Sequence, residues 1–269
     1  MKGRRGFTLI ELLVAVTIVA LLAGLSVGSV QKVFEAARKT EEMNGARSLI
    51  IAYQLSASEN NGNYMAGYDD SLSQMVLEDG RAIHGPAAQR YPHRLREYLS
   101  VELEDSILVG KVKSPVEVHD DYSVSLFPAF GINATFVGGN IDSQGDVANR
   151  ADCITSVGNA SSSVLVFASS QYESGNGSTI HGFHNLTPPR TDRRRWSASP
   201  WTSDSSPTAF GNVHARYSNK AICAFLDGSV RMQSIEELKD MRLWSRMAIE
   251  QNDPDYTIAR QRGGSGRIR

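Results

Sequence analysis

Cysteine is scarce in this sequence, and its scarcity limits the kinds of site that the chain can build. Cys153 and Cys223 are the only two cysteines in 269 residues, which excludes a disulfide framework and a four-cysteine zinc site. An excess of one charge is missing as well, because 28 basic and 29 acidic residues leave a net charge of −1. The chain therefore has no overall basic field that would favour nucleic acid as a partner.

Proline and charge are both missing from the N-terminal part of the chain. No proline lies between Phe7 and Glu59, and Glu11 is the only charged residue in 7–30. Of these 24 residues 17 are apolar. As a helix they would extend roughly 36 Å, which is enough to cross a hydrocarbon core of ~30 Å. We therefore predict a membrane-spanning or filament-core helix over 7–30.

The helical pattern continues beyond this apolar run. Apolar residues recur at spacings of three and four from Val30 to Tyr53, which predicts an amphipathic continuation over 31–60. Charged residues, Glu41 and Glu42 among them, are expected on the opposite face. The turn cluster Asn60–Asn63 is expected to end the helix. We expect the head that follows to fold alone when the chain is cut after Ala57.

A basic leader, residues 1–6, precedes the apolar run. Its Lys2, Arg4 and Arg5 predict that this end stays in the cytoplasm. An ordinary secretory signal peptide is disfavoured for two reasons. Its apolar region needs only about 7–15 residues, fewer than the 24 found here. It is also followed by an A-x-A cleavage site of small residues, which this apolar run lacks. A plain anchor does not explain Glu11, since a carboxylate at a membrane helix centre costs ~2.5–3.5 kcal/mol.

Residues 6–14 read GFTLIELLV, and they resemble the prepilin-type signal of type IV pilins and type II secretion pseudopilins. The resemblance implies cleavage between Gly6 and Phe7 by a membrane prepilin peptidase, followed by N-methylation of Phe7. It also implies that Glu11 aligns subunits during assembly. The implied partners are copies of the same chain, the inner membrane, and the assembly platform of a secretion system or pilus. The head would then lie in the periplasm.

The head, 61–255, shows short strands joined by turns, so we predict an α+β fold in which the second half of the helix packs on an antiparallel sheet. Residues 256–269 are expected to be a disordered tail. An Asp227-Gly228 hairpin turn is predicted after the last of these strands. The expected helices are Ser71–Leu77, Pro92–Leu99 and Ile235–Glu250, and the expected strands are Ile107–Val112, Tyr122–Phe127, Gly131–Val137, Ser163–Ser169 and Ala221–Leu226.

A second resemblance lies near the C-terminus. Arg216-Tyr217, nine further residues and Asp227-Gly228 are similar to the H-X9-DG segment of large pseudopilin-like proteins. Tyr217 stands at the position of the histidine, so the chain departs from that pattern. This resemblance implies no particular chemistry for the segment.

Several clusters in the head can be interpreted either as a functional site or as an ordinary structural feature. Asp142, Asp146 and Asp152 are weak calcium candidates, with a solvated loop as the favoured alternative. His181 and His184 have a metal-like spacing without nearby further ligands. Arg190 to Trp196, with Arg193, Arg194 and Arg195, suits a DNA or polyanion contact. The favoured alternative is a solvated loop, or a loop that pairs with acidic residues of a neighbouring subunit. Cys153 and Cys223 either form a disulfide or remain apolar and buried.

The sequence has no nucleophile elbow, P-loop, zinc-protease motif or dinucleotide fingerprint. We therefore expect a structural protein and no enzyme, and no cofactor apart from the calcium candidate. The expected function is that of a pseudopilin assembled into a periplasmic filament for type II secretion. A subunit of a surface or DNA-uptake pilus is an alternative, as is a binding module or enzyme tethered by a pilin-type anchor.

Overall fold

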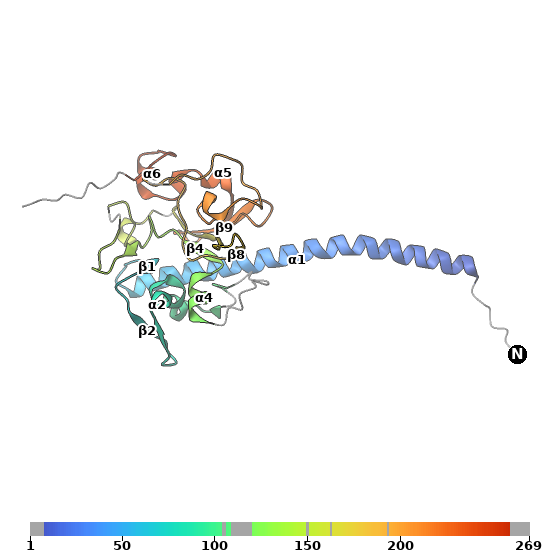
Figure 1. Cartoon of the computed structure of the whole chain (residues 1–269), viewed down its shortest axis with the longest axis horizontal. Helices are drawn as coiled ribbons and strands as arrows, with labels where there is room; N and C mark the ends of the chain where they lie inside the picture. The colour runs from blue at the N-terminus through green and yellow to red at the C-terminus, as the bar shows by residue number, and fades with distance from the viewer. Residues whose placement is uncertain are drawn as a thin grey trace, which may run out of the picture. The chain divides into compact units, whose positions relative to one another are not determined.

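The computed structural model describes residues 8–103, 106–108, 120–148, 151–161, 163–192 and 194–258, with no description of the side chains of 22–29. The chain divides into two compact units, Met1–Thr40 and Glu41–Arg269. Helix α1, Leu9–Glu59, contributes to both (Figure 1). Its 51 residues contain no proline, which explains why its hydrogen-bond ladder is not interrupted.

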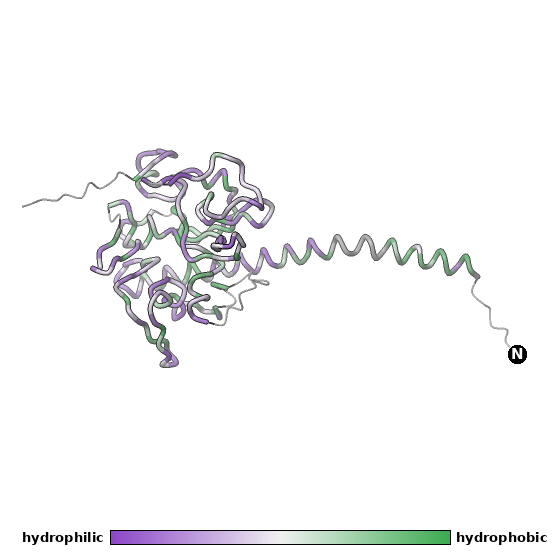
Figure 2. Tube along the Cα trace, in the orientation of Figure 1, coloured by the Kyte–Doolittle hydropathy of each residue, from purple (hydrophilic) through white to green (hydrophobic). Residues whose placement is uncertain are grey.

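The first unit exposes apolar side chains of α1. Leu9, Ile10 and Val16 are all more than half exposed, and Figure 2 colours the described N-terminal turns mainly as hydrophobic. Within the described part of the chain, no helix combines membrane-spanning length with sufficient apolar character. The expected span 7–30 therefore stays a prediction. Val33 and Phe34 are exposed too, although the sequence pattern placed Val33 on a packing face.

The second unit contains the last turns of α1. Burial begins at Glu42 and continues through Leu49, Ile50 and Tyr53 to Ala57. The helix then ends with Asn61 in the left-handed region at φ 52 and the Gly62 N–H donating to the Ala57 carbonyl at 2.7 Å. This six-to-one bond satisfies a terminal carbonyl. The expected helix end at Asn60–Asn63 is confirmed.

A four-stranded antiparallel sheet, in the order β10-β9-β6-β4, forms the centre of the head. Alternate residues of β9 serve two cores: Ile222 and Ala224 pack with Leu49 and Tyr53 of α1, whereas Cys223 joins Trp244 on the other face. This alternation follows from the two-residue period of a strand. The bounds are β4 Phe130–Ile132, β6 Leu165–Ser169, β9 Lys220–Phe225 and β10 Val230–Ser234. The expected α+β class is confirmed.

Smaller elements surround this centre. A parallel pair β1·β5 and the hairpins β2·β3 and β7·β8 form two-stranded sheets. Their bounds are β1 Tyr68–Asp69, β2 Gln74–Val76, β3 Ala82–His84, β5 Asn140–Ile141, β7 Gln171–Glu173 and β8 Thr179–His181. The short helices are α2 Pro86–Gln89, α3 Tyr91–Arg94, η1 Arg96–Tyr98, α4 Asp121–Leu126, η3 Val157–Asn159, η4 Pro207–Phe210, α5 Ile235–Leu238, η5 Met241–Leu243 and α6 Arg246–Glu250.

Four expected elements are confirmed in kind. Helical turns α3 and η1 occupy most of Pro92–Leu99, and β6 and β9 match the strands expected at Ser163–Ser169 and Ala221–Leu226. The Asp227-Gly228 turn joins β9 to β10, with Gly228 at φ 80. Gly131–Val137 is a strand only at its beginning, within β4. The expected strand Ile107–Val112 lies outside the described residues from 109 onward.

Two expected elements have the wrong type. Ser71–Leu77 contains strand β2, because it pairs with β3 across the turn at Gly80. Tyr122–Phe127 is helix α4, because the side chain of Asp120 accepts the Ser123 N–H and caps the first turn. Capping by an aspartate favours a helix over the strand that the aromatic and β-branched residues suggested.

The C-terminal region also differs from expectation. Ile235–Glu250 is not one helix but α5, η5 and α6, because the side chains of Ser234, Asp240 and Ser245 each cap a new start. Tyr256 and Ile258 are buried in the second core, so the expected tail 256–269 is wrong for its first three residues. Residues 259–269 lie outside the described residues.

The expected boundary after Ala57 is wrong as well. Leu49, Ile50 and Tyr53 precede it, and all three are fully buried in the main core. A head that began after Ala57 would lack one wall of that core. The compact unit that the contacts define begins at Glu41.

Candidate functional site

The N-terminal motif is described from Thr8 onward, so Gly6 and Phe7 lie outside the described residues. Glu11 accepts the backbone N–H of Thr8 at 2.9 Å and its hydroxyl at 2.8 Å, while the Glu11 N–H donates to the Thr8 hydroxyl at 3.4 Å. This reciprocal pair is a capping box that begins helix α1. Glu11 remains exposed in the first turn, so its carboxylate has acceptor capacity left for a second donor.

A second carboxylate of α1 is buried in the head. Glu42 is 0% exposed and accepts hydrogen bonds from the hydroxyls of Ser169 at 2.9 Å and Tyr217 at 2.7 Å. The Arg216 guanidinium lies 3.2 Å from the same carboxylate. Ionised hydrogen-bond partners are the strong ones, and a buried charge needs them. These three groups together neutralise and solvate Glu42 inside the protein.

Arg216 is itself held by the sheet. Its guanidinium donates to the carbonyl of Ala129 at 3.0 Å and to that of Ser170 at 3.4 Å, and its side chain is 9% exposed. Backbone carbonyls fix the guanidinium in place, so Glu42 meets a cation whose position does not depend on the helix. The charge pair therefore favours one placement of α1 on the sheet.

A second contact with α1 lies further along the chain, directly after strand β9. The side-chain amide of Gln54 donates to the Leu226 carbonyl at 2.7 Å, and Gly228 lies beside that amide.

The sequence pattern missed the site around Glu42 because it placed Glu42 on the polar face of the helix. The available signal was spacing: Glu42 lies four residues before Ala46 and seven before Leu49, on the stripe that is buried.

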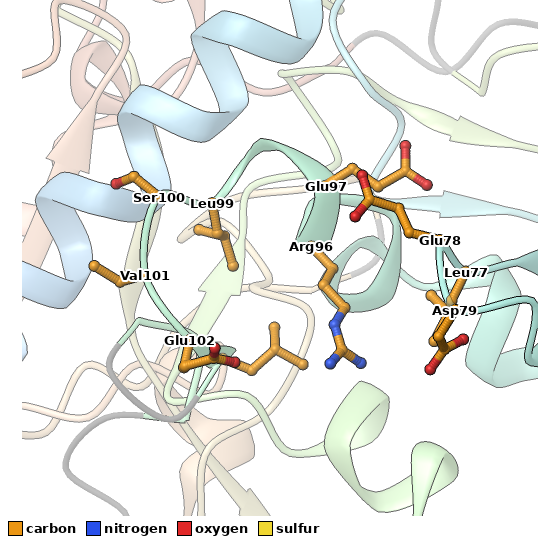
Figure 3. Close-up of a pocket in the computed structure, with 10 residues that line it drawn as sticks. Leu77, Glu78, Asp79, Arg96, Glu97, Leu99, Ser100, Val101 and Glu102 are labelled. Atoms are coloured by element: carbon orange, nitrogen blue, oxygen red, sulfur yellow. The ribbon is translucent and has the colours of Figure 1, made fainter.

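A groove of about 640 Å³ lies elsewhere on the head. Four carboxylates, those of Glu78, Asp79, Glu97 and Glu102, line it together with the guanidinium of Arg96. Figure 3 shows Arg96 extending into the space between Asp79 and Glu102. This excess of negative charge disfavours anionic ligands.

The calcium candidates do not meet at one site. Asp142 accepts the backbone N–H groups of Gln144 and Asp146, both at 2.9 Å, and so stabilises its own turn. Asp152 accepts the hydroxyl of Tyr256 at 2.7 Å. Among the described residues there is no group of three or more histidine, cysteine, aspartate or glutamate side chains that could hold a metal ion. Asp142 therefore stabilises a turn, and Asp152 holds Tyr256 in place.

The histidine pair has separate surroundings. The His181 ring contacts the His214 ring at 5.3 Å between centroids, whereas the His184 ring contacts Phe183. Burial lowers the pKa of both His184 and His214 to about 3, helped by nearby Arg90 and Arg216 respectively. The rings of His184 and His214 are therefore neutral at physiological pH.

The arginine-rich segment contributes to the core through its aromatic residue. The Trp196 indole donates to the Thr187 carbonyl at 2.9 Å and packs edge-on against Phe210 and Trp244. Arg190 pairs with Asp255, and Arg193 lies outside the described residues. Trp196 therefore packs against the second core, and Arg190 is paired within the head; both interpretations of the arginine-rich segment stay predictions.

The two cysteines are unpaired. Cys153 and Cys223 are both free and buried, so the disulfide alternative is wrong and the apolar alternative is confirmed. Burial raises the pKa of the Cys153 thiol to about 12 and raises that of Cys223 as well. Neither thiol is ionised at neutral pH, so neither is an activated nucleophile.

Comparison with known proteins finds similarity at the N-terminus. Residues 1–27 match the family model described as the prokaryotic N-terminal methylation motif. No curated protein and no solved structure is significantly similar to the chain. The match confirms the expected prepilin-type motif and supports a type IV pilin-like protein that is processed as a prepilin.

Proposed function

We propose that this pilin-like chain is a structural subunit of a periplasmic filament that serves type II protein secretion. Prepilin peptidase cleaves it between Gly6 and Phe7 and methylates Phe7. The segment 7–30 anchors it in the inner membrane, with the N-terminus in the cytoplasm and the head in the periplasm. Copies of the chain then assemble through their N-terminal helices on a secretion platform.

The observation that carries this proposal is the methylation motif over residues 1–27. Two further features support it. Leu9, Leu12 and Val14 lie on different sides of α1, at about 100° a residue, and each is at least half exposed. A helix that is apolar all round suits lipid or like helices. Glu11 stands exposed among them, and an ionisable group within an apolar span is expected to have a partner that neutralises it.

The proposal gives the head a structural role and no catalytic one. The buried carboxylate of Glu42 is bonded to Ser169, Arg216 and Tyr217, and these partners hold the helix to the sheet. The buried carboxylate of Glu42 therefore serves to attach helix α1 to the head. A head firmly fixed to its helix suits a subunit that is added to a filament through that helix.

The test is the mass and N-terminal sequence of the chain from cells that contain prepilin peptidase. We expect a chain that starts at Phe7 and carries one N-methyl group. A chain that keeps Met1, or one that starts after Gly28, would contradict the proposal. The proposed role in type II secretion is tested by deleting the gene that encodes the chain and measuring the export of secreted proteins. Unchanged export together with lost surface pili would favour a pilus.

A further inference from the structure

The segment Arg216–Gly228 contacts helix α1 at both of its ends, near Glu42 and near Gln54. We propose that this segment, here called the clasp segment, fixes the axial register of α1 on the head, and that Glu42 is the residue it recognises. The inference does not depend on the proposed filament, because every contact lies within the unit Glu41–Arg269.

The recognition of Glu42 is specific because its three partners come from two segments that are far apart in the sequence. Ser169 ends β6, while Arg216 and Tyr217 precede β9. A shift of the helix by one residue turns each side chain by about 100° around the axis, at 3.6 residues a turn. Such a shift would remove the carboxylate from all three donors and leave buried polar groups without partners, which is costly.

The nine-residue spacing of the segment has a geometric meaning. Ser218 and Asn219 have φ of 49° and 61°, and Tyr217 and Lys220 exchange backbone hydrogen bonds across them, as in a tight turn with two left-handed residues. Strand β9 then covers about 20 Å over its six residues. From Glu42 to Gln54 the helix rises about 18 Å. The strand is therefore long enough to reach the second contact.

The turn beside the second contact favours glycine because of its backbone conformation. Gly228 has φ 80°, which side chains rarely adopt, and its Cα side lies within ordinary contact distance of the Gln54 amide, where a Cβ would stand 3.7–3.8 Å away. The turn also leaves the Leu226 carbonyl available for that amide. Tyr217 thus makes the first contact with α1, and the Asp-Gly turn directly follows Leu226, which makes the second.

Tyr217 contributes through its hydroxyl, which donates to Glu42 at 2.7 Å. A histidine ring N–H can donate to a carboxylate in the same way. The clasp therefore requires a side-chain donor at this position, and either residue type satisfies the requirement. Phenylalanine supplies the ring without the donor.

Hydrogen exchange of the full chain in detergent micelles, followed peptide by peptide, tests the clasp. We expect Glu42→Ala to speed exchange of the α1 amides 43–57 by about a hundredfold, since breaking a buried pair costs several kcal/mol. Strands β6 and β9 should change far less. The matched control is Glu41→Ala, which alters the exposed neighbour and should leave exchange unchanged. Equal acceleration throughout helix and sheet, or none in the helix, overturns the inference.

Tyr217 variants keep the test decisive if Glu42→Ala does not fold. We expect Tyr217→Phe to speed exchange of 43–57 by about tenfold, the effect of a lost hydrogen bond to a charged group. Tyr217→His should restore most of the protection, although histidine is smaller than phenylalanine. If Tyr217→Phe protects the helix as well as the native residue does, or if Tyr217→His is no better than Tyr217→Phe, the clasp is refuted.

Discussion

At the scale of single residues, two of the glutamates of helix α1, Glu11 and Glu42, have opposite surroundings. Glu11 is exposed and bonded only locally, to Thr8, in the contacts described here. Glu42 is fully buried and bonded to residues far along the chain. Loss of Glu11 therefore removes a helix cap, while loss of Glu42 leaves buried donors without an acceptor. The first change should alter assembly and the second should alter the head.

We predict that Glu11→Val leaves cleavage at Gly6–Phe7 intact but prevents assembly. Cleavage frees a cationic α-amino group on Phe7, and an incoming subunit could neutralise the carboxylate with it. The measurement is the yield of sedimentable filaments beside the mature mass of the chain. Glu35→Gln, an exposed change on the same helix, should assemble normally. Filaments of Glu11→Val at native yield would contradict the register role of Glu11.

Asn133 is a second residue whose role is defined by its contacts. It is fully buried, and its amide donates to the carbonyls of Leu165 at 2.9 Å and Trp244 at 3.0 Å, which joins the sheet to the C-terminal turns. We predict that Asn133→Ala lowers the free energy of unfolding by about 2 kcal/mol. Denaturant unfolding measures this. Asn44→Ala, an exposed change, should stay within about 0.5 kcal/mol of the native chain.

At the scale of elements, the last turns of α1 belong to the head. Ala46, Leu49, Ile50 and Tyr53 pack with strand residues in one core, so the helix is both an N-terminal rod element and a wall of the globular unit. Its buried and exposed parts meet near Thr40, where the compact unit begins. The sheet has no other helix of comparable length among the described residues.

We predict that a chain beginning at Glu41 folds alone, whereas a chain beginning at Ser58 does not. The shorter chain loses Glu42, Leu49, Ile50 and Tyr53, and each large buried side chain contributes about 2–5 kcal/mol. The sum for Leu49, Ile50 and Tyr53 is comparable to the whole typical net stability of about 5–15 kcal/mol. Thermal unfolding followed by circular dichroism measures the result. A cooperative transition for the Ser58 chain would show that the helix is dispensable.

At the scale of the whole molecule, two neutral histidines make stability depend on pH. The pKa values of His184 and His214 are lowered to about 3 by burial, while both are near 6.5 in an unfolded chain. Between these values the unfolded state binds more protons. Stability is therefore fully present above pH about 6.5 and is lost as the pH falls toward 3.

We predict that the free energy of unfolding falls by up to about 1.4 kcal/mol per pH unit for each of these histidines between pH 6.5 and 5. Denaturant unfolding at several pH values measures the slope. His184→Gln and His214→Gln should each make the slope shallower. His84→Gln, at an exposed position, is the matched control. A slope that is the same in all four chains would exclude His184 and His214 as its cause.

Local chemistry explains why some features could be predicted from the sequence. The methylation motif, the proline-free helix, its Asn-Gly end and the Asp-Gly hairpin each depend on neighbouring residues. The strands β6 and β9 were recognisable from their apolar, β-branched composition. Where local signals competed, prediction failed: Asp120 caps a helix in a strand-like sequence, and Asp240 and Ser245 divide one helical pattern into pieces.

The sequence by itself determined the processing motif and the extent of helix α1, because cleavage signals and helix breakers act over a few residues. Only the tertiary structure decided what Glu42 does. Its partners Ser169 and Tyr217 lie 127 and 175 residues away along the chain, and no local pattern records such a separation. A glutamate among charged neighbours looks like a solvent-facing residue. It becomes a buried attachment point only because β6 and the turn before β9 place a hydroxyl, a guanidinium and a phenol around it.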